Sequence, residues 1–253
     1  MGLIQQVKFD SWDKFKDYIK NHYTRYPAWV FRGQRNSMWE IESTLTRLAN
    51  NVHLLPKVLE EHQKTLFRKR IRGLRGANPS PMNEDELWSL GQHHGLATPL
   101  IDWSESPFIA AYFAFEQKEK SETGYRSIYV LDKYGIEERA SEKQITDFSF
   151  IEPLQDDNSR IIAQAGLFTK VPTGISFEAF LLKHELQFHL VELQIPDASR
   201  IEALSDLRVM NIQANTVYPD LHGAAISCNM WHENVSENFE QEEAKKIEST
   251  NAQ

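Results

Sequence analysis

Residues 28–34 read AWVFRGQ, and this short stretch sets the expectation for the whole fold. Its first four residues are apolar and aromatic and follow Pro27, a composition that is typical of a β-strand. Arg32 and Gly33 then leave the carboxyl end of the predicted strand. An arginine carries five donors in a rigid fork that suits phosphate or carboxylate, and a glycine lets the backbone come close to a ligand. We therefore interpret Arg32 as an anion-binding residue, with a structural salt bridge as the alternative.

Apolar residues at helical spacing predict helices on both sides of that strand. Ser106-Pro107 places a serine N-cap before a proline at the first helical position, and Asn83 with Glu86 forms a capping box. A second strand is predicted over 127–131, and residues 186–195 indicate a strand that has a bulge or is buried on both faces. The expected fold is α/β (α+β), with helices flanking a mixed, mostly antiparallel central sheet. Helices are expected over 11–22, 54–72, 83–91, 106–115, 201–207 and up to about residue 231, a loop before Ser106, and irregular structure over 135–158.

The composition is that of a folded globular protein: of 253 residues, 41% are hydrophobic and 25% are charged. The formal net charge of −8 argues against broad nucleic-acid binding, which depends on an excess of lysine and arginine. Cys228 is the single cysteine, so no intrachain disulfide can form and a reducing compartment is expected. No signal peptide is recognisable, and no apolar run approaches the roughly 20 residues that span a bilayer. We expect a cytoplasmic protein without a membrane partner.

Two segments depart from this average composition. Residues 64–75 read KTLFRKRIRGLR, without an acidic residue. This stretch, from Lys64 to Arg75, is a candidate face for an RNA or a protein target, and the alternative is a solvated helix face. From His232 to residue 253 the chain is polar and acidic with almost no apolar anchors, so we expect one domain over 1–231 followed by a disordered tail.

The densest polar cluster is residues 91–107, GQHHGLATPLIDWSESP. It contains donors, acceptors, an acid and an indole between a helix end and a helix start. The N-terminus of the incoming helix would add free N–H groups and positive potential, which suit an anion. Each residue also has a structural alternative: Ser106 as only a helix cap, Asp102 as a loop-stabilising residue, and His93 or its neighbour as a core histidine.

Several familiar kinds of site have no support in the sequence. There is no HExxH, no CxxC and no other clustering of histidines, so no metal is expected. There is also no nucleophile elbow, no P-loop and no GxGxxG.

Four blocks of residues follow one another along the chain. They are Trp29–Gln34 with Trp39, Ser43, Leu45 and Arg47; Gln92–Gly95, Thr98, Leu100–Trp103, Ser106-Pro107, Ala111, Phe113 and Ala114; Asn158–Ile161, Gln164, Gly166 and Phe168; and Tyr218–Leu221 with Gly223. In this order the blocks resemble the FRG domain family, which is named for its Phe-Arg-Gly motif, and the resemblance covers residues 5–230, nearly the whole chain. One position departs from the family pattern: the family usually has Pro-Thr-Arg before Leu-Leu-Asp-Trp, whereas this chain has Ala97-Thr98-Pro99.

A more distant similarity is to the arginine and Ser-Thr-Ser motifs of ADP-ribosyltransferases. This resemblance implies that Arg32 binds the phosphate of NAD, that Ser104 or Ser106 braces the pocket, and that Trp103 stacks on a flat base. Gln164 would stand at the position of the late acidic residue, but an amide cannot act as a general base. The acid would then come from Asp102, Glu105, Glu178 or Glu185.

These resemblances give a set of expected site residues. The catalytic group is Arg32, Asp102 and Gln164, with NAD as a substrate and no metal. The ligand-binding residues are Gln34, Arg47, Gln92, His93, Thr98, Trp103, Ser106 and Asp220.

Three functions remain open from the sequence. The first is an NAD-consuming ADP-ribosyltransferase or glycohydrolase that acts in conflict between bacteria and phage, since the FRG family occurs in small bacterial and phage proteins. The second is a non-catalytic module that binds a nucleotide, an RNA or a protein. The third is a phosphodiester-cleaving enzyme that uses His93 and Asp102.

Overall fold

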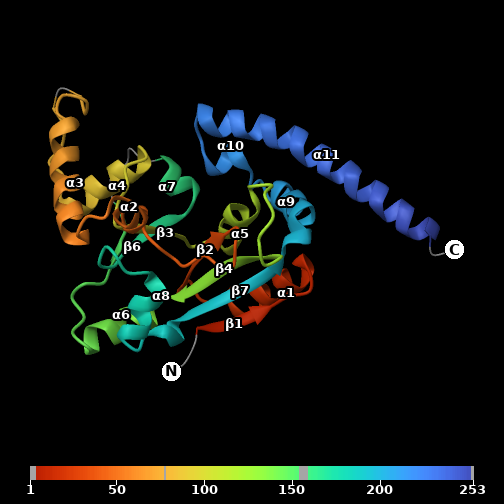
Figure 1. The fold of residues 1–253 in the computed structure, drawn as a ribbon, viewed down its shortest axis with the longest axis horizontal. Helices are drawn as coiled ribbons and strands as arrows, with labels where there is room; N and C mark the ends of the chain where they lie inside the picture. The colour runs from red at the N-terminus through yellow and green to blue at the C-terminus, as the bar shows by residue number, and fades with distance from the viewer. Residues whose placement is uncertain (1–3, 77, 154–158, 252–253) are drawn as a thin grey trace.

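A computed structural model describes residues 4–76, 78–153 and 159–251. Its centre is a seven-stranded sheet in the order β1-β7-β4-β2-β3-β6-β5, in which β1 and β7 pair parallel and the other neighbours pair antiparallel (Figure 1). The predicted α/β class with a mixed, mostly antiparallel sheet is therefore confirmed. The strands are β1 (Gln5–Lys8), β2 (Trp29–Gln34), β3 (Leu100–Ser104), β4 (Tyr125–Asp132), β5 (Ser149–Ile151), β6 (Gly166–Lys170) and β7 (Leu190–Pro196).

Helices cover both faces of the sheet. Strand side chains point alternately to the two faces, so Phe31 of β2 packs in one core cluster and its neighbour Val30 packs in the other. The first cluster also contains α1, α5, α9 and α10, and the second contains α6 and α8. The helices are α1 (Trp12–His22), α2 (Thr44–Val52), α3 (Pro56–Arg70), α4 (Glu84–His93), α5 (Pro107–Phe115), α6 (Lys133–Glu142), α7 (Ser159–Ala163), α8 (Phe177–Lys183), α9 (Arg200–Val209), α10 (Ala214–Val217) and α11 (Leu221–Asn251), with short 3-10 turns η1 (Gln187–His189) and η2 (Asp197–Ser199).

The Phe-Arg-Gly segment lies inside a strand, not after one. Residues 29–34 all pair with β4, with Arg32 opposite Tyr129 and Gln34 opposite Ser127. The prediction that Arg32 and Gly33 leave the end of the strand was therefore wrong, because the ladder continues for three residues beyond the aromatic run. Gly33 is required there by packing: a Cβ on this residue would lie 1.8 Å from the Ala110 carbonyl oxygen of α5.

The sheet opens between β2 and β3. Within the described residues these two strands pair at one position, Phe31 with Ser104, whereas β2 pairs with β4 over six residues. Beyond Phe31 the two strands diverge, and the Arg32 guanidinium donates from β2 to the Asp102 carbonyl of β3 across the opening, at 2.9 Å. This divergence provides the space for a cleft at the centre of the sheet.

Several predicted boundaries are correct because local chemistry fixes them. Ser11 caps α1, Asn83 and Glu86 form the capping box of α4, and Ser106 caps α5. Two expectations were wrong. Residues 133–142 form α6 and 149–151 form β5 where irregular structure was expected, and the expected loop before Ser106 contains β3. Residues 186–195, expected to be a strand with a bulge or one buried on both faces, are the turn η1 followed by β7, and residues 192–195 of β7 are all buried.

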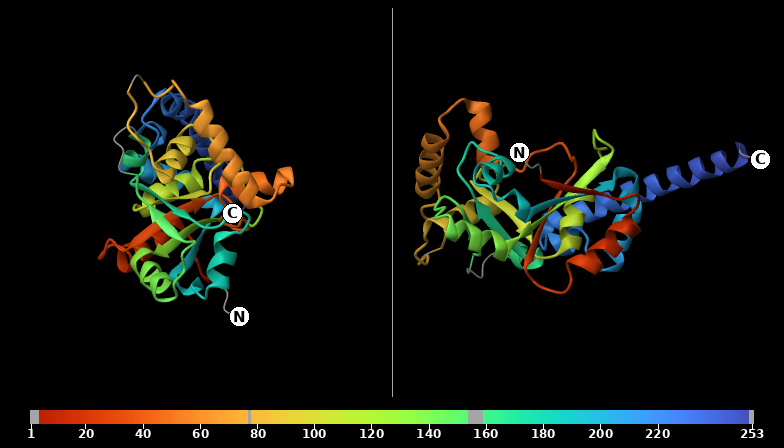
Figure 2. Two further views of the ribbon diagram at one scale, coloured as in Figure 1. Left: turned by 90° about the vertical axis from the view of Figure 1, so that its left-hand side faces the viewer. Right: turned by 90° about the horizontal axis from the view of Figure 1, so that it is seen from below.

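The C-terminal segment differs from the expected disordered tail. It continues α11 to Asn251, and the helix projects away from the sheet (Figures 1 and 2). Residues 224–251 contain neither glycine nor proline and are rich in glutamate, which favours a helix. Polar contacts hold the first part of the segment: Glu237 pairs with Arg200 and Glu233 with Lys118.

Two further observations concern the described part of the chain. None of its helices combines the length and the apolar character needed to cross a bilayer. Asn158, which belongs to the third block of the FRG resemblance, lies outside the described residues.

Candidate functional site

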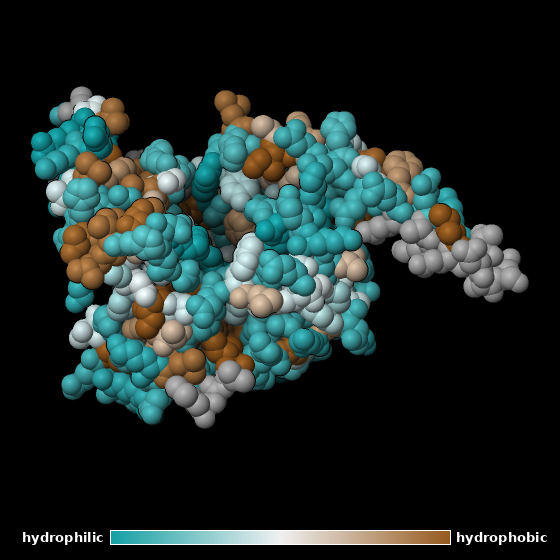
Figure 3. Space-filling model, viewed as in Figure 1, coloured by the Kyte–Doolittle hydropathy of each residue, from teal (hydrophilic) through white to brown (hydrophobic). Residues whose placement is uncertain are grey.

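A cleft of about 1010 Å³ lies where β2 and β3 diverge. In Figure 3 the surface is hollowed between the part of the molecule that carries α3 and α4 and the part that carries α10. The cleft brings together residues that are far apart in the sequence, from β2, β3, α4, α5 and the segment before α11. Of the predicted site residues, those that line it are Arg32, Gln34, Arg47, Gln92, Asp102, Trp103 and Gln164.

Arg32 is a largely desolvated cation in this cleft. Its side chain is 18% exposed, and besides the bond to the Asp102 carbonyl its Nη1 lies 3.7 Å from the Asp102 carboxylate. Burial lowers the pKa of Arg32 and the Asp102 charge opposes this shift, but a guanidinium stays protonated in proteins. Its Nε is buried and has no partner among the described residues. Arg32 therefore retains an unused N–H donor.

Asp102 is held by a short polar relay. Gln92 Nε2 of α4 donates to the Asp102 carboxylate at 2.5 Å, and Thr98 Oγ1 donates to the side-chain oxygen Oε1 of Gln92. Thr98 N in turn donates to Thr44 Oγ1 of α2 at 2.9 Å. Thr98 itself is fully buried and is not among the residues that line the cleft. The relay ties the start of β3 to two helices and gives Asp102 a fixed orientation.

Three more residues line this wall: Gln34, which was predicted to bind ligand, Trp39, which stood only in a family block, and Arg35, which was not predicted. Gln34 is only 8% exposed, yet its Oε1 has no partner among the described residues. The buried Arg35 Nε also has none, and the Arg35 guanidinium lies 5.0 Å from the centre of the Trp39 ring. Trp39 is 43% exposed. The wall thus offers two cations, a free amide oxygen and an accessible indole.

Trp103 is buried, although it was expected to stack on a flat base of the ligand. Its side chain is 3% exposed, its indole N–H donates to Thr169 at 2.9 Å, and its ring packs against Phe177. A ring that is packed in the core has no free face on which a base could stack. The exposed aromatic ring of the cleft is Trp39, which the sequence placed only within a family block.

The serines before α5 have structural contacts. Ser104 Oγ donates to the Gln164 carbonyl at 2.7 Å and accepts from Ser106 N at 3.0 Å. Ser106 Oγ accepts from Ile109 N, the bond of a helix N-cap, and Ser106 does not line the cleft. Gln164 Nε2 donates to the Val217 carbonyl at 3.2 Å. These contacts join β3, α7 and α10 on one side of the cleft.

We expect Ser106→Ala to lower the free energy of unfolding by about 1 kcal/mol, the usual effect of losing a serine N-cap. Urea denaturation measures this change, and Ser106→Asp, which can still cap, should stay close to wild type. Ligand-induced stabilisation should be unaffected. Its loss in Ser106→Ala would show that the hydroxyl contacts ligand directly.

The remaining predicted residues lie at the margin or outside the cleft. Arg47 lines it and donates to the Glu42 carbonyl at 2.7 Å. His93 is not a lining residue, and its ring is edge-on to His94 with 4.9 Å between ring centroids. Asp220 accepts from Gly223 N at 2.9 Å and pairs with Arg160, and these two bonds lower its pKa, the backbone bond most. Asp220 therefore caps and anchors the start of α11.

Glu116 is the cleft residue that sequence reasoning missed. It follows the apolar helix α5, and its carboxylate accepts a hydrogen bond from the Tyr218 hydroxyl at 3.1 Å. Burial raises the pKa of Glu116 to about 7. One signal in the sequence could have identified it: an acidic residue directly follows the apolar helix, in FIAAYFAFE. Burying a charge costs free energy, so a glutamate at this position is a candidate functional residue.

Of the four acids proposed from the sequence, Asp102 alone lines the cleft. Burial also raises the pKa of Glu178 to about 7, but both of its oxygens accept the Ile41 N–H at 2.9 Å. Glu178 therefore holds the backbone next to the cleft. Lys143 pairs with Glu185 and lowers its pKa.

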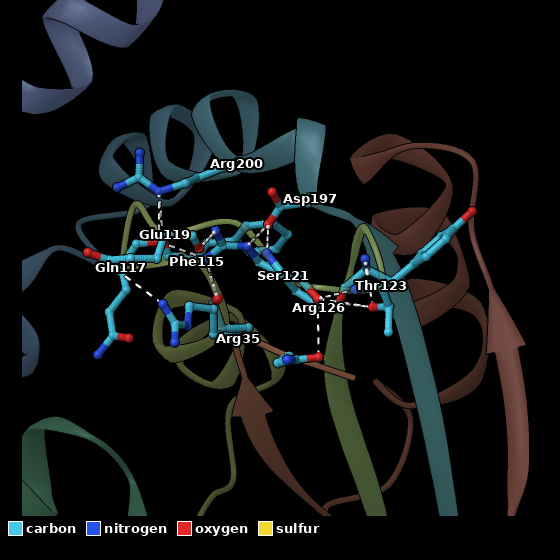
Figure 4. Close-up of polar contacts among 12 residues, drawn as sticks. Arg35, Phe115, Gln117, Glu119, Ser121, Thr123, Arg126, Asp197 and Arg200 are labelled. Carbon is cyan, nitrogen blue, oxygen red and sulfur yellow. Dashed lines mark hydrogen bonds and ion pairs between the residues drawn. The ribbon is translucent and has the colours of Figure 1, made fainter. Parts of the chain in front are cut away.

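Two buried arginines fix the segment that carries Glu116 (Figure 4). Arg126 donates to the carbonyls of Ala114 and Gln117, both at 2.8 Å, and Arg200 donates to those of Phe115 and Glu116 at 3.0 and 3.1 Å. The last carbonyls of a helix have no partner within the helix, so these guanidinium groups satisfy them. The carboxyl end of α5 is consequently a rigid part of the cleft wall.

In the described ranges, no group of three or more histidine, cysteine, aspartate or glutamate residues is arranged to hold a metal ion. The donors gathered at the cleft are cationic and amide groups, which suit an anion.

The sequence comparisons agree with the Phe-Arg-Gly motif. A family model of the FRG domain matches residues 27–123, which include β2, β3, α5 and most of the polar wall of the cleft. The chain is thus similar to the FRG domain over this region. Searches of curated proteins and of solved structures each found no match.

Proposed function

We propose that this FRG-domain protein binds a phosphate-bearing nucleotide in the cleft between β2 and β3. The observation that carries the proposal is a set of three buried polar atoms without a partner in the described chain: Arg32 Nε, Arg35 Nε and Gln34 Oε1. An unsatisfied buried polar group costs about 1–3 kcal/mol, so three of them on one wall indicate that a ligand completes their hydrogen bonds.

The chemistry of this wall favours a nucleotide over other ligands. Two guanidinium groups match the charge and fork geometry of phosphate. The exposed ring of Trp39 provides a surface on which a base can stack. The cleft volume of about 1010 Å³ also exceeds what a simple anion needs.

Within this class we propose NAD as the ligand, with the protein acting as an NAD-consuming transferase or glycohydrolase in conflict between bacteria and phage. Support comes from the likeness of the Arg32 strand and the Ser104 segment to ADP-ribosyltransferase motifs. The acids that line the cleft are Glu40, Glu42, Asp102 and Glu116, and of these Asp102 and Glu116 are our candidates for such a reaction. Gln164 has no acid-base role in this proposal, because its amide bonds to the Val217 carbonyl.

The test is a thermal-shift panel of NAD, ADP-ribose, AMP and inorganic phosphate. At 100 times its Kd, a true ligand should stabilise the protein by about 2.7 kcal/mol, which is roughly 5–10 °C for a chain of this size. Arg32→Ala should abolish the shift because it removes the central cation. Nicotinamide release, followed by chromatography, measures turnover in the same samples.

Arg139→Ala is the matched control, since Arg139 is an exposed arginine of α6 that pairs with Glu142. It should respond to ligand as wild type does. If no nucleotide shifts the melting temperature, the binding proposal fails. If NAD stabilises the protein and remains intact, the protein is a non-catalytic nucleotide-binding module.

A second candidate function uses the carboxyl end of α3. Arg68, Lys69 and Arg70 are exposed there, whereas Lys64 is committed to ion pairs with Glu61 and Glu84. These three cations fit an RNA or an acidic protein target. Salt-dependent RNA binding that disappears when all three are changed to glutamate would support this function. The phosphodiester-cleaving alternative loses support, because His93 does not line the cleft with Asp102.

A further inference from the structure

Glu116 occupies a fixed place in the wall of the cleft. It follows α5 directly, and its N–H donates to the Tyr112 carbonyl at 2.7 Å. Its own carbonyl accepts from Arg200, and Arg126 and Arg200 hold the carbonyls on either side (Figure 4). The backbone of Glu116 is therefore held on both sides, and the hydrogen bond from Tyr218 orients its carboxylate.

The Glu116 carboxylate is incompletely satisfied. Tyr218 donates to Oε2, whereas Oε1 receives no hydrogen bond from the residues that the structure describes. Within those residues no cation forms an ion pair with this carboxylate, although it lies at the negative end of a helix dipole. Desolvation accordingly raises its pKa to about 7.

The ionisable groups around Glu116 come from four elements. Tyr112 belongs to α5, and burial together with the Glu116 charge raises its pKa. Tyr218, between α10 and α11, donates to the carboxylate. Arg200 of α9 holds the backbone carbonyl, and Arg160 of α7 lies 5.5 Å from the Tyr218 ring and pairs with Asp220. These cations are engaged elsewhere, so the open carboxylate oxygen is left for a ligand.

The lining of the cleft therefore combines two chemistries. Arg32 Nε and Arg35 Nε are donors without a partner among the described residues, and Glu116 with Tyr218 offers an acceptor. A phosphate placed against the Glu116 carboxylate would be repelled by it, whereas a neutral hydroxyl could donate to it. Both kinds of group line one cleft, so a ligand that carries phosphate and hydroxyl groups can contact both.

We infer that Glu116 accepts a hydrogen bond from a sugar hydroxyl of the ligand, so that the cleft selects sugar phosphates over simple anions. This inference rests on the proposed nucleotide site. A site built to bond a hydroxyl discriminates strongly against analogues without one, because its own polar group is otherwise left unpaired. Tyr218 is a positioning residue in this arrangement, since it orients the carboxylate.

The test compares ADP-ribose with pyrophosphate by calorimetry at pH 8, where Glu116 is ionised. Glu116→Ala should weaken ADP-ribose binding about 10-fold or more and leave pyrophosphate binding unchanged or tighter. Glu116→Gln, whose amide oxygen still accepts, should recover part of the loss. Tyr218→Phe should weaken ADP-ribose binding to a smaller extent.

The outcomes separate the two proposals. If Glu116→Ala changes the affinities of both ligands by the same factor, or changes neither, the inference is overturned while the nucleotide site stands. The same holds if wild type binds pyrophosphate but not ADP-ribose. If wild type binds neither ligand, the nucleotide site itself fails and the inference fails with it.

A ligand-free measurement checks the environment of the carboxylate. Between the ordinary glutamate pKa of 4.5 and about 7, the folded protein binds more protons at Glu116 than the unfolded chain does. Its contribution to stability therefore falls as pH rises through that window. The melting temperature of Glu116→Gln minus that of wild type should increase from pH 5 to pH 8. A difference that stays constant would show that the carboxylate is solvated and would overturn the inference.

Discussion

Gly33→Ala is expected to lower the free energy of unfolding by about 3 kcal/mol or more, a large part of the 5–15 kcal/mol that typically stabilises a domain. The added methyl would lie 1.8 Å from the Ala110 carbonyl oxygen and 2.8 Å from the Ala114 amide nitrogen. Both atoms belong to the backbone of α5, so no side-chain rotation can relieve the overlap. The helix would have to move away from β2. Urea denaturation followed by circular dichroism measures the change.

Gly166→Ala is a matched control on β6. Its Cβ would meet the nearest atoms at 3.4–3.8 Å, which is ordinary van der Waals contact. Replacing glycine by alanine restricts the unfolded chain and often stabilises by about 0.4–1 kcal/mol where the native backbone allows it. We expect a change of at most about 1 kcal/mol in either direction. Equal destabilisation by the two variants would contradict the steric explanation.

Arg126→Met is expected to destabilise the protein by about 3–5 kcal/mol, the usual cost of removing one partner from a buried ion pair. The side chain of Arg126 is fully buried, and its Nε pairs with Asp197 at 2.5 Å. It also donates to the carbonyls of Ala114, Gln117 and Glu119. Methionine fills the space but leaves these acceptors and the Asp197 charge unsatisfied.

The control for this variant is Arg139→Met, which breaks an exposed Arg139–Glu142 pair one turn apart on α6. Exposed pairs contribute little, so a change within about 0.5 kcal/mol is expected. Denaturation midpoints and slopes of both variants give the comparison. If Arg126→Met is as stable as the control variant, the guanidinium does not anchor the end of α5.

The Arg126 result bears on the cleft as well as on stability. Arg126 and Arg200 together donate to five backbone carbonyls of the segment that carries Glu116, those of Ala114, Phe115, Glu116, Gln117 and Glu119. Arg200 also reaches α11 through Asn234 and Glu237. The projecting helix is thus tied to the same segment that carries Glu116.

Local features were predictable from the sequence wherever a few neighbouring residues decide them. Ser106 followed by proline fixed the start of α5, and the apolar run after it fixed the burial of that helix. Helix α6 was not predicted, because it is mostly polar and buries only Ile136 and Ala140. Strand β3 was not predicted, because Asp102 and Ser104 interrupt its apolar residues and the segment shows no regular alternation of apolar and polar residues.

The sequence by itself determined the α/β class, the capped helices and the presence of a strand at Trp29–Phe31, because propensity, capping and hydrophobic spacing act over a few residues. It also placed Arg32, Gln92 and Asp102 at a common site. Only the tertiary structure decided that the cleft opens between β2 and β3, that Trp103 is buried while Trp39 is exposed, and that Glu116 lines the same cleft as Arg32. These facts depend on strand register and helix packing between residues distant along the chain, which no local pattern encodes.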